Sequence, residues 1–132
     1  MKYSINQNDK HDIEASLKYT AHILQENKNC VIMYPQGELL PFDKRPVMFK
    51  RGGLSFLLDH CEKQFQILSI ACKIQYYTER KPEVIVNFGQ LINSKIKGCL
   101  KKTETDFIKT IDELDKNSIN RNFCKEILYG KF

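Results

Sequence analysis

Val31-Ile32-Met33-Tyr34-Pro35-Gln36-Gly37-Glu38 and, after a loop, Phe49-Lys50-Arg51-Gly52-Gly53 are the stretches that decide the expected fold of this chain. The apolar run that ends at Tyr34 contains β-branched residues and predicts a buried strand over residues 30–34, which Pro35 and Gly37 stop. The second stretch leads through two glycines into an apolar helix over residues 54–61. We therefore expect a strand, a loop and a helix in succession.

The start of this helix has features of an anion site. Glycines at a helix N-terminus expose backbone N–H groups, and the helix dipole favours negative charge there. Arg45, Lys50 and Arg51 add positive charge nearby. By pattern alone, a plain connection with solvated basic residues is the better interpretation, and a phosphate or carboxylate site is the alternative.

Regular patterns on both sides of this region predict the remaining elements. Ile13, Leu17, Ala21 and Leu24 recur at helical spacing, so residues 12–27 are expected to form an amphipathic helix. The other expected elements are a short strand at residues 2–7, a strand at 65–77, a turn at 80–82, a strand at 83–88 that Gly89 stops, a helix at 100–114 and a short helix at 119–132.

The order of these elements predicts an α/β fold with a mixed, mostly parallel sheet flanked by helices. The last two strands, on either side of Pro82, are candidates for an antiparallel hairpin. The chain has 132 residues, of which 42% are hydrophobic and 28% are charged, and this composition argues against intrinsic disorder. We expect a single domain over residues 1–132.

Charge and cysteine content limit the classes of partner. The formal net charge of +5 is compatible with a phosphorylated small molecule, an anionic membrane surface or nucleic acid. Because basic residues are scattered and no aromatic-interleaved patch occurs, we expect no nucleic-acid binding. No pair of cysteines has the CxxC spacing, so we expect reduced core residues of a cytoplasmic protein and no metal. The cysteines are Cys30, Cys61, Cys72, Cys99 and Cys124.

The stretch from residue 31 onward resembles the third conserved block of the phosphate/glycerol acyltransferase family, which includes the 1-acyl-glycerol-3-phosphate acyltransferases. That block reads Phe-Pro-Glu-Gly-Thr-Arg-Ser after an apolar strand, and a later Phe-Lys-x-Gly opens the next helix. Here Tyr34–Glu38 stands for the first part and Phe49–Gly52 for the second. The resemblance covers residues 1–92, with 93–132 as a helical extension. It implies a partial glycerol-3-phosphate acyltransferase-like fold.

The resemblance also implies a site for the glycerol phosphate group of a lipid acceptor. Two departures change its chemistry, because Gln36 replaces the family's Glu and Leu39 falls where its Arg would be. The amide can hydrogen-bond a phosphate or hydroxyl oxygen but has no charge, so we expect Arg45, Lys50 or Arg51 to supply it. The expected substrate-binding residues are Tyr34, Pro35, Gln36, Gly37, Glu38, Arg45, Lys50, Arg51 and Gly52.

The family's catalytic block has no counterpart in this sequence. The family uses His-x4-Asp, in which the His is the expected general base and the Asp orients it. Five residues after His11, His22 and His60 come Ser, Asn and Phe. Ser4-Ile5-Asn6-Gln7 weakly resembles the family's second block, but the uncharged Asn6 and Gln7 stand where that block usually has Asp-Arg. We expect no catalytic residue in this chain.

Together these features predict the acceptor-binding part of a lysophospholipid or glycerolipid acyltransferase, similar to a bacterial branch of the family. The complete domain would transfer an acyl group from acyl-CoA or acyl-ACP to a lipid hydroxyl without a bound cofactor. This chain would be either an N-terminally truncated product or the partner of a separately encoded N-terminal half. The alternative is a non-catalytic anion- or lipid-binding module.

Localisation is expected to be cytoplasmic. No stretch approaches the ~20 apolar residues of a membrane span, and the first residues have no signal-peptide pattern. Peripheral contact with the inner face of the membrane is an open alternative, because a group of lysines could approach anionic lipid. A solvated helix face explains the same lysines. They are Lys95, Lys97, Lys101 and Lys102.

Overall fold

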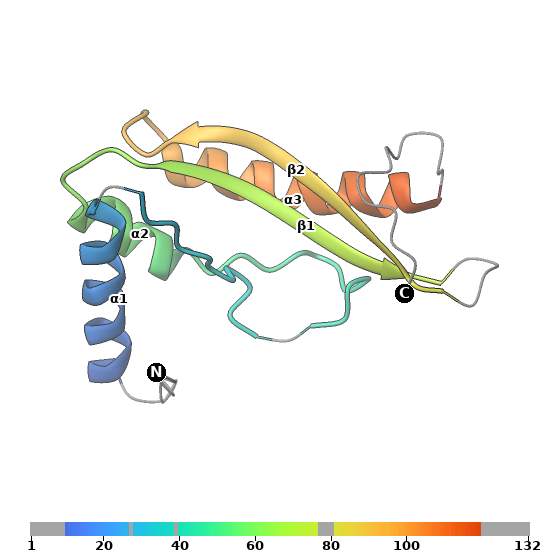
Figure 1. The fold of residues 1–132 in the computed structure, drawn as a ribbon, viewed down its shortest axis with the longest axis horizontal. Coiled ribbons are helices and arrows are strands. Elements are labelled where there is room, and N and C mark those ends of the chain that lie inside the picture. The colour runs from blue at the N-terminus through green and yellow to red at the C-terminus, as the bar shows by residue number, and fades with distance from the viewer. Residues whose placement is uncertain (1–9, 27, 39, 77–80, 120–132) are drawn as a thin grey trace. The chain divides into compact units, whose positions relative to one another are not determined.

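The structure is a computed structural model that describes residues 10–26, 28–38, 40–76 and 81–119. In this part of the chain, helices and strands follow one another in the order α1, α2, β1, β2, α3 (Figure 1). Both element types expected of an α/β protein are therefore present. The chain divides into two compact units, the first comprising Met1–Ile67 with Ile92–Lys101 and the second Leu68–Leu91 with Lys102–Phe132. Each unit is described by itself.

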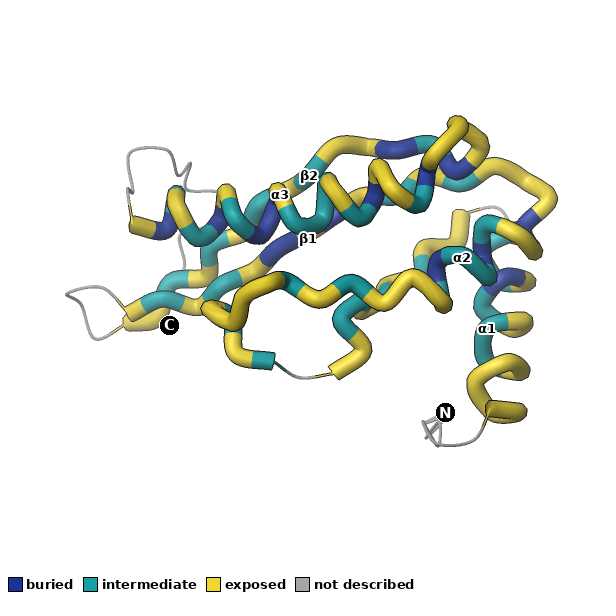
Figure 2. Tube along the Cα trace, turned by 180° about the vertical axis from the view of Figure 1, so that it is seen from behind, coloured by how far each residue is buried: buried dark blue, intermediate teal, exposed yellow. Residues whose placement is uncertain are grey.

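Two helices, α1 (Lys10–Gln25) and α2 (Arg51–His60), pack together in the first unit. They confirm the helices predicted from the apolar spacing on either side of the motif. Their contact buries Ala21 of α1 with Leu57 of α2 and with Cys61, which caps α2 (Figure 2). Three half-buried side chains complete this cluster, namely Leu24, Met33 and Phe65.

The prediction of a strand at residues 30–34 was wrong. A strand needs a hydrogen-bonded neighbour, and in the described residues the sheet consists of β1 and β2 alone. Residues 30–34 instead run as an irregular segment that Met33 anchors to the cluster between α1 and α2. Ile32 and Tyr34 are 79% and 83% exposed. The apolar run therefore alternates half-buried residues, Val31 and Met33, with the exposed Ile32 and Tyr34, and is not a buried strand.

The second unit is built on the hairpin of β1 (Gln66–Gln75) and β2 (Glu83–Asn93), which begins and ends within the first unit. The two strands pair in antiparallel fashion (Figure 1). This pairing confirms the hairpin around Pro82 and shows that the prediction of a mostly parallel sheet was wrong. The connection from Gln75 to Glu83 is shorter than the dozen or more residues that a parallel crossover needs, so it permits only the antiparallel arrangement.

The helix predicted at residues 100–114 is confirmed as α3 (Cys99–Ile119), which runs along one face of the hairpin (Figure 1). Polar contacts join the two: Asn87 donates to the carbonyl of Thr110 at 3.0 Å, and the N–H of Gln90 donates to Asp106 at 3.0 Å. Residues buried along one stripe of α3 include Thr103, Thr110, Leu114 and Ser118.

Gly89 does not stop β2, contrary to the prediction, because the strand continues to Asn93. A glycine inside a strand often marks a close approach of a neighbouring element. Here a Cβ atom at Gly89 would overlap the Asp106 carboxylate and would lie 2.6 Å from the Thr110 hydroxyl oxygen. Gly89 is therefore a position at which α3 approaches the sheet too closely for a larger side chain.

The two faces of this sheet have an unusual distribution of polarity. Most side chains on the α3 side are small or polar, as at Ser69, Ala71, Lys73 and Asn87, and Ile67 and Ile85 are large apolar residues at inward positions. On the other face, which we call the open face, every second residue is exposed although most are large and apolar. The open face comprises Leu68, Ile70, Cys72, Ile74 and Tyr76 from β1 and its end, and Val84, Val86 and Phe88 from β2.

Some predicted features lie outside the described residues. They are the strand at 2–7 with its motif echo at 4–7, Leu39, the start of the turn at residue 80, the helix beyond Ile119, and Cys124. The expectation of a single domain stays a prediction. Among the helices that the structure describes, none is long and apolar enough to cross a bilayer.

Candidate functional site

The first half of the motif forms a tight turn. The backbone N–H of Gly37 donates to the carbonyl of Tyr34 at 3.1 Å, with Pro35 and Gln36 at the corner. Proline suits the second position of such a turn, because its φ angle is already fixed near the required value. Gly37 has a φ of 69°, in the left-handed region that glycine adopts without a steric penalty. The sequence Pro-Gln-Gly thus specifies this turn locally.

Lys50 joins the second half of the motif to that turn. Its backbone N–H donates to the carbonyl of Pro35 at 2.7 Å. Its side chain lies across Gly37, where an added Cβ atom would come within 2.7 Å of the lysine Cδ. Its amino group is 3.9 Å from a carboxylate oxygen of Glu38. The structure therefore brings together Pro35, Gly37, Glu38 and Lys50 from the two predicted blocks.

The same lysine marks the start of α2. Lys50 is the N-cap of the helix and makes no side-chain capping hydrogen bond, and the first turn contains no acidic residue. The helix dipole places partial positive charge at this end, and Lys50 and Arg51 add two cationic side chains beside it. Glu38 offsets part of this charge through its contact with Lys50. The result is a local excess of positive charge of the kind that binds anions.

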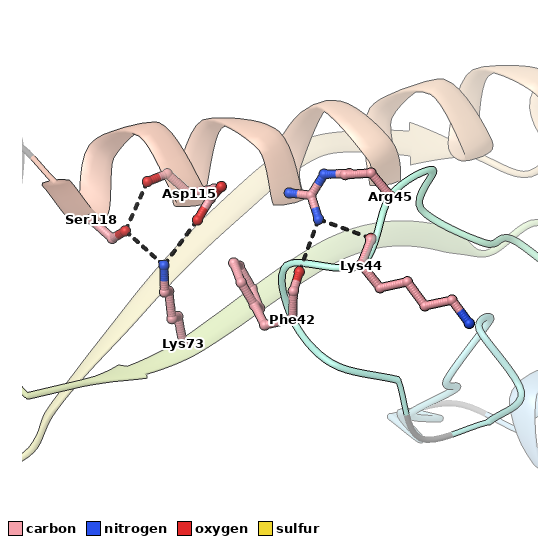
Figure 3. A network of polar contacts seen from close by, with 6 residues as sticks. All are labelled: Phe42, Lys44, Arg45, Lys73, Asp115 and Ser118. Carbon is pink, nitrogen blue, oxygen red and sulfur yellow. Dashed lines mark hydrogen bonds and ion pairs between the residues drawn. The ribbon is translucent and has the colours of Figure 1, made fainter.

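Arg45 is held differently from Lys50. Its guanidinium donates to the carbonyls of Phe42 at 2.9 Å and Lys44 at 3.1 Å (Figure 3). These hydrogen bonds hold Arg45 within its own loop, whereas the hydrogen bond and the ion pair described above connect Lys50 to the turn. Lys50 is therefore the better candidate for the charge that the sequence assigned to three basic residues.

The remaining predicted site residues lie around this turn with different accessibility. Tyr34 and Glu38 are exposed, and Gln36 is half-buried at the corner. Arg51 and Gly52 occupy the first turn of α2 and are exposed. No heavy atom lies within 4 Å of a Cβ atom built at Gly52. The space beside the helix N-terminus is therefore open at this position.

Two of the described histidines, His22 and His60, lie at the C-terminal ends of helices. His22 lies in the last turn of α1, 3.5 Å from Glu26. His60 ends α2, where its Nδ1 atom is 2.9 Å from the carbonyl oxygen of Phe56 and its ring stacks on the Phe56 ring at 3.8 Å. These contacts suit helix-end residues, and neither histidine contacts an aspartate through them. In the part of the chain that the structure describes, no three His, Cys, Asp or Glu residues group in a way that could hold a metal ion.

One feature of the first unit was not predicted from the sequence, an open cavity of about 470 Å³ at the C-terminal end of α1. It is lined by residues 24–26, 28–31 and 63–66, and no motif marks these positions. Nearby, Lys95 donates to the carbonyl of Cys61 at 2.9 Å. One of the four lysines considered for membrane contact therefore helps to hold the end of α2.

A polar cluster in the second unit also escaped prediction. The amino group of Lys73 donates to Asp115 at 2.9 Å and to the Ser118 hydroxyl at 3.1 Å (Figure 3). Ser118 in turn donates to the carbonyl of Asp115 at 2.8 Å. The available signal was that Lys73, at an inward position, is the single charged residue of β1. This cluster helps to hold α3 on the sheet.

Comparison with known proteins leaves the family of this chain undetermined. No family model, no curated protein and no solved structure matches it. The functional assignment therefore depends on the motif residues and on their geometry.

Proposed function

We propose that this chain supplies the acceptor-binding part of a lysophospholipid or glycerolipid acyltransferase and transfers no acyl group by itself. In this proposal the turn at Tyr34–Gly37 and the start of α2 bind the phosphate of the lipid acceptor. An acyl group would come from acyl-CoA or acyl-ACP, and catalysis would require a His-x4-Asp block, which residues 1–132 do not contain. The proposal builds on the resemblance of residues 31–53 to the family's third block.

The observation that carries the proposal is the closure of the two motif blocks by Lys50. Blocks that are separate in the sequence meet at one helix N-terminus through a 2.7 Å hydrogen bond from Lys50 to Pro35. The amino group of Lys50, the first turn of α2 and the Gln36 amide are then available to one anion. A phosphate held there is favoured both by the helix dipole and by a charge-assisted hydrogen bond from lysine.

The alternative function is a module that binds anions without any link to acyl transfer. It is favoured by Gln36, which has lost the charge of the family's Glu, and by the absence of a His-x4-Asp sequence. The two candidates differ in specificity. An acceptor site should prefer a phosphate that carries a neighbouring free hydroxyl, whereas a simple anion module should bind inorganic phosphate equally well.

Calorimetric titration of the whole chain tests both candidates. We expect a short-chain lysophosphatidate and glycerol 3-phosphate to bind more tightly than inorganic phosphate. Lys50→Gln should weaken binding at least ~10-fold, the loss of one charge-assisted hydrogen bond. The backbone bond to Pro35 does not depend on the lysine side chain, so the turn should persist, as a thermal melt can verify.

Lys44→Gln is the matched control, because it removes one exposed cation from the same loop. Its affinity should stay within about twofold of the unmodified chain, since distant surface charges are screened by salt. Equal losses in the two variants would show that only net charge matters and would overturn the assignment to Lys50. Equal affinity for inorganic phosphate and lysophosphatidate would favour the anion module instead.

A further inference from the structure

The open face of the β1–β2 sheet is the largest feature of the described chain that the proposed function leaves unused. Its seven large apolar residues, Leu68, Ile70, Ile74, Tyr76, Val84, Val86 and Phe88, are each between 41% and 65% exposed. In an ordinary two-layer arrangement, the apolar face of a sheet is the face that its helix covers. Here α3 covers the face that carries Ser69, Lys73 and Asn87, on which Ile67 and Ile85 are large apolar residues.

Contacts to α3 show that this orientation is specific. Lys73 reaches Asp115 and Ser118, Asn87 reaches Thr110, and Gly89 lies directly beneath Asp106. If the opposite face of the hairpin faced α3, these polar groups would lose their partners on the helix. Large side chains would then lie where Gly89 now permits close approach. The exposure of the apolar face is therefore a consequence of the way in which α3 is held.

The size of the open face matches a protein interface. These seven residues together expose on the order of 800 Å², backbone and the Tyr76 hydroxyl included, which is about the area that each partner contributes to a standard stable interface. The largest apolar patch of a typical monomer is ~300–600 Å². The open face exceeds that range, so we expect a partner to cover it.

The charge of the open face indicates which partner it fits. The outward positions between Gln66 and Tyr76 and between Val84 and Gln90 include no charged residue, although 28% of the chain is charged. A partner selected by opposite charge would require charges on this face. Two copies of a chain with a net charge of +5 repel each other over most of their surfaces, and an uncharged apolar face is where that repulsion is least.

We propose that the open face is the interface of a homodimer, in which the β1–β2 sheets of two copies pack face to face. A two-fold axis would set the same patch of each copy against the other, the commonest symmetry of soluble homo-oligomers. The sheets would lie ~10 Å apart and form a sandwich core from side chains that are now exposed. This inference does not depend on the proposed function, because it uses no residue of the Tyr34–Lys50 site.

Sedimentation equilibrium of the full chain across the micromolar range, with reductant present, tests the proposal. We expect a mass of twice the 15.5 kDa of the chain. Ile70→Lys places a charge in each copy of the interface and should raise the dissociation constant at least ~100-fold, since like charges are then juxtaposed without water. Tyr19→Lys adds the same charge at an exposed position of α1 and should leave the mass unchanged.

Cys72 provides a second readout that requires no substitution. It is exposed and lies on the open face, so dimerisation should protect its thiol from a maleimide, and dilution should restore labelling. Mass spectrometry of the labelled peptide separates Cys72 from the other cysteines. A monomer at all concentrations would overturn the proposal, whether Cys72 is labelled or is covered by another segment of its own chain. A dimer that persists in Ile70→Lys, or whose Cys72 is labelled at the monomer rate, would do the same.

Phospholipid vesicles provide the remaining arm of the test. If the unmodified chain is monomeric in solution and Cys72 becomes protected only when vesicles of neutral phosphatidylcholine are added, the open face binds lipid and the dimer is excluded. We expect Cys72 protection to depend on protein concentration and not on vesicles.

Discussion

Lys50 donates its backbone N–H to the carbonyl oxygen of Pro35 at 2.7 Å, and its side chain crosses Gly37 on the way to Glu38. One residue thus closes the loop between the two motif blocks and begins α2. The backbone part of this closure fixes the position of the turn, and the side chain adds charge beside it. The two contributions can be tested separately.

Gly37→Ala should destabilise the chain by about 1–2 kcal/mol through backbone strain alone, because φ is 69° at this position and a left-handed conformation is costly for residues with a Cβ. Displacement of the Lys50 side chain, 2.7 Å from the new atom, adds to this cost. Gly52→Ala is the control, since its Cβ meets no atom within 4 Å and alanine favours a helix by ~0.5–1 kcal/mol. Urea denaturation should therefore shift in opposite directions, and equal shifts would contradict the description of the turn.

Gly89→Ala should destabilise the packing of α3 on the sheet by about 1–3 kcal/mol, the usual cost of overfilling a close contact. The new methyl group would overlap Asp106 and crowd Thr110. Combining it with Asp106→Ala should recover part of this loss, because the overlapping carboxylate is then absent. Thermal denaturation of the two single variants and the double variant measures this coupling. Additive losses would mean that Asp106 is not the obstacle.

The Lys73–Asp115 pair should contribute a coupling energy of about 1 kcal/mol in a double-mutant cycle of Lys73→Met and Asp115→Asn. The side chain of Lys73 is only 20% exposed, but that of Asp115 is 42% exposed, so solvent screening reduces the value below that of a buried pair. The exposed pair Lys109–Glu113 is the comparison and should give only ~0.3–0.5 kcal/mol. Similar coupling energies for the two pairs would show that the burial of Lys73 does not strengthen its interaction with Asp115.

The thiol of Cys61 should react more slowly with iodoacetamide than the exposed Cys30 at every pH between 7 and 9. Burial raises the pKa of Cys61, and nearby Lys95 offsets only part of this effect. Because the thiolate is the reacting species, a raised pKa moves the reaction of Cys61 to higher pH. Peptide mass spectrometry of a pH series measures both rates in one sample, and equal rates would contradict the burial of Cys61.

The same shift of the Cys61 pKa makes a contribution to stability that depends on pH. The unfolded chain loses the thiol proton at a lower pH than the folded chain does, so the folded state binds more protons between the two pKa values. Stability is therefore unaffected below the ordinary thiol pKa of ~8.5 and falls as the pH rises toward the raised value. Cys61→Ala should remove this part of the alkaline decline in urea midpoint.

Local patterns were sufficient to predict most helices and the hairpin. The spacing of Ile13, Leu17, Ala21 and Leu24 gave α1, because burial of one helix face repeats with the helical period. Pro82 marked the turn region of the hairpin. The strand predicted at residues 30–34 was wrong because an apolar run this short has no periodicity that distinguishes a strand from an irregular segment. The strand that would pair with it also had to be assumed.

For the candidate site, sequence spacing suggested a group of residues but could not distinguish their individual roles. Arg45, Lys50 and Arg51 are equivalent by composition, and only the path of the loop distinguishes Lys50, which joins the turn, from Arg45, which bonds to Phe42 and Lys44. Polarity of the sheet faces also could not be predicted. Alternation shows which residues share a face, but long-range contacts such as Lys73 to Asp115 decide which face the helix covers.

The division of the chain into two units has a consequence for cleavage experiments. The backbone passes from one unit to the other three times, after Ile67, after Leu91 and after Lys101. A protease that cuts once can therefore release neither unit as a continuous fragment. Because each unit consists of two separate stretches of chain, a deletion from either end cannot remove one unit and leave the other complete. A cut after Lys101 would separate the remainder of α3 from the sheet in the covalent chain and leave the two joined by non-covalent contacts, among them those with Lys73, Asn87 and Gln90. Retention of the nicked fragments in one particle would then report directly on the strength of those contacts.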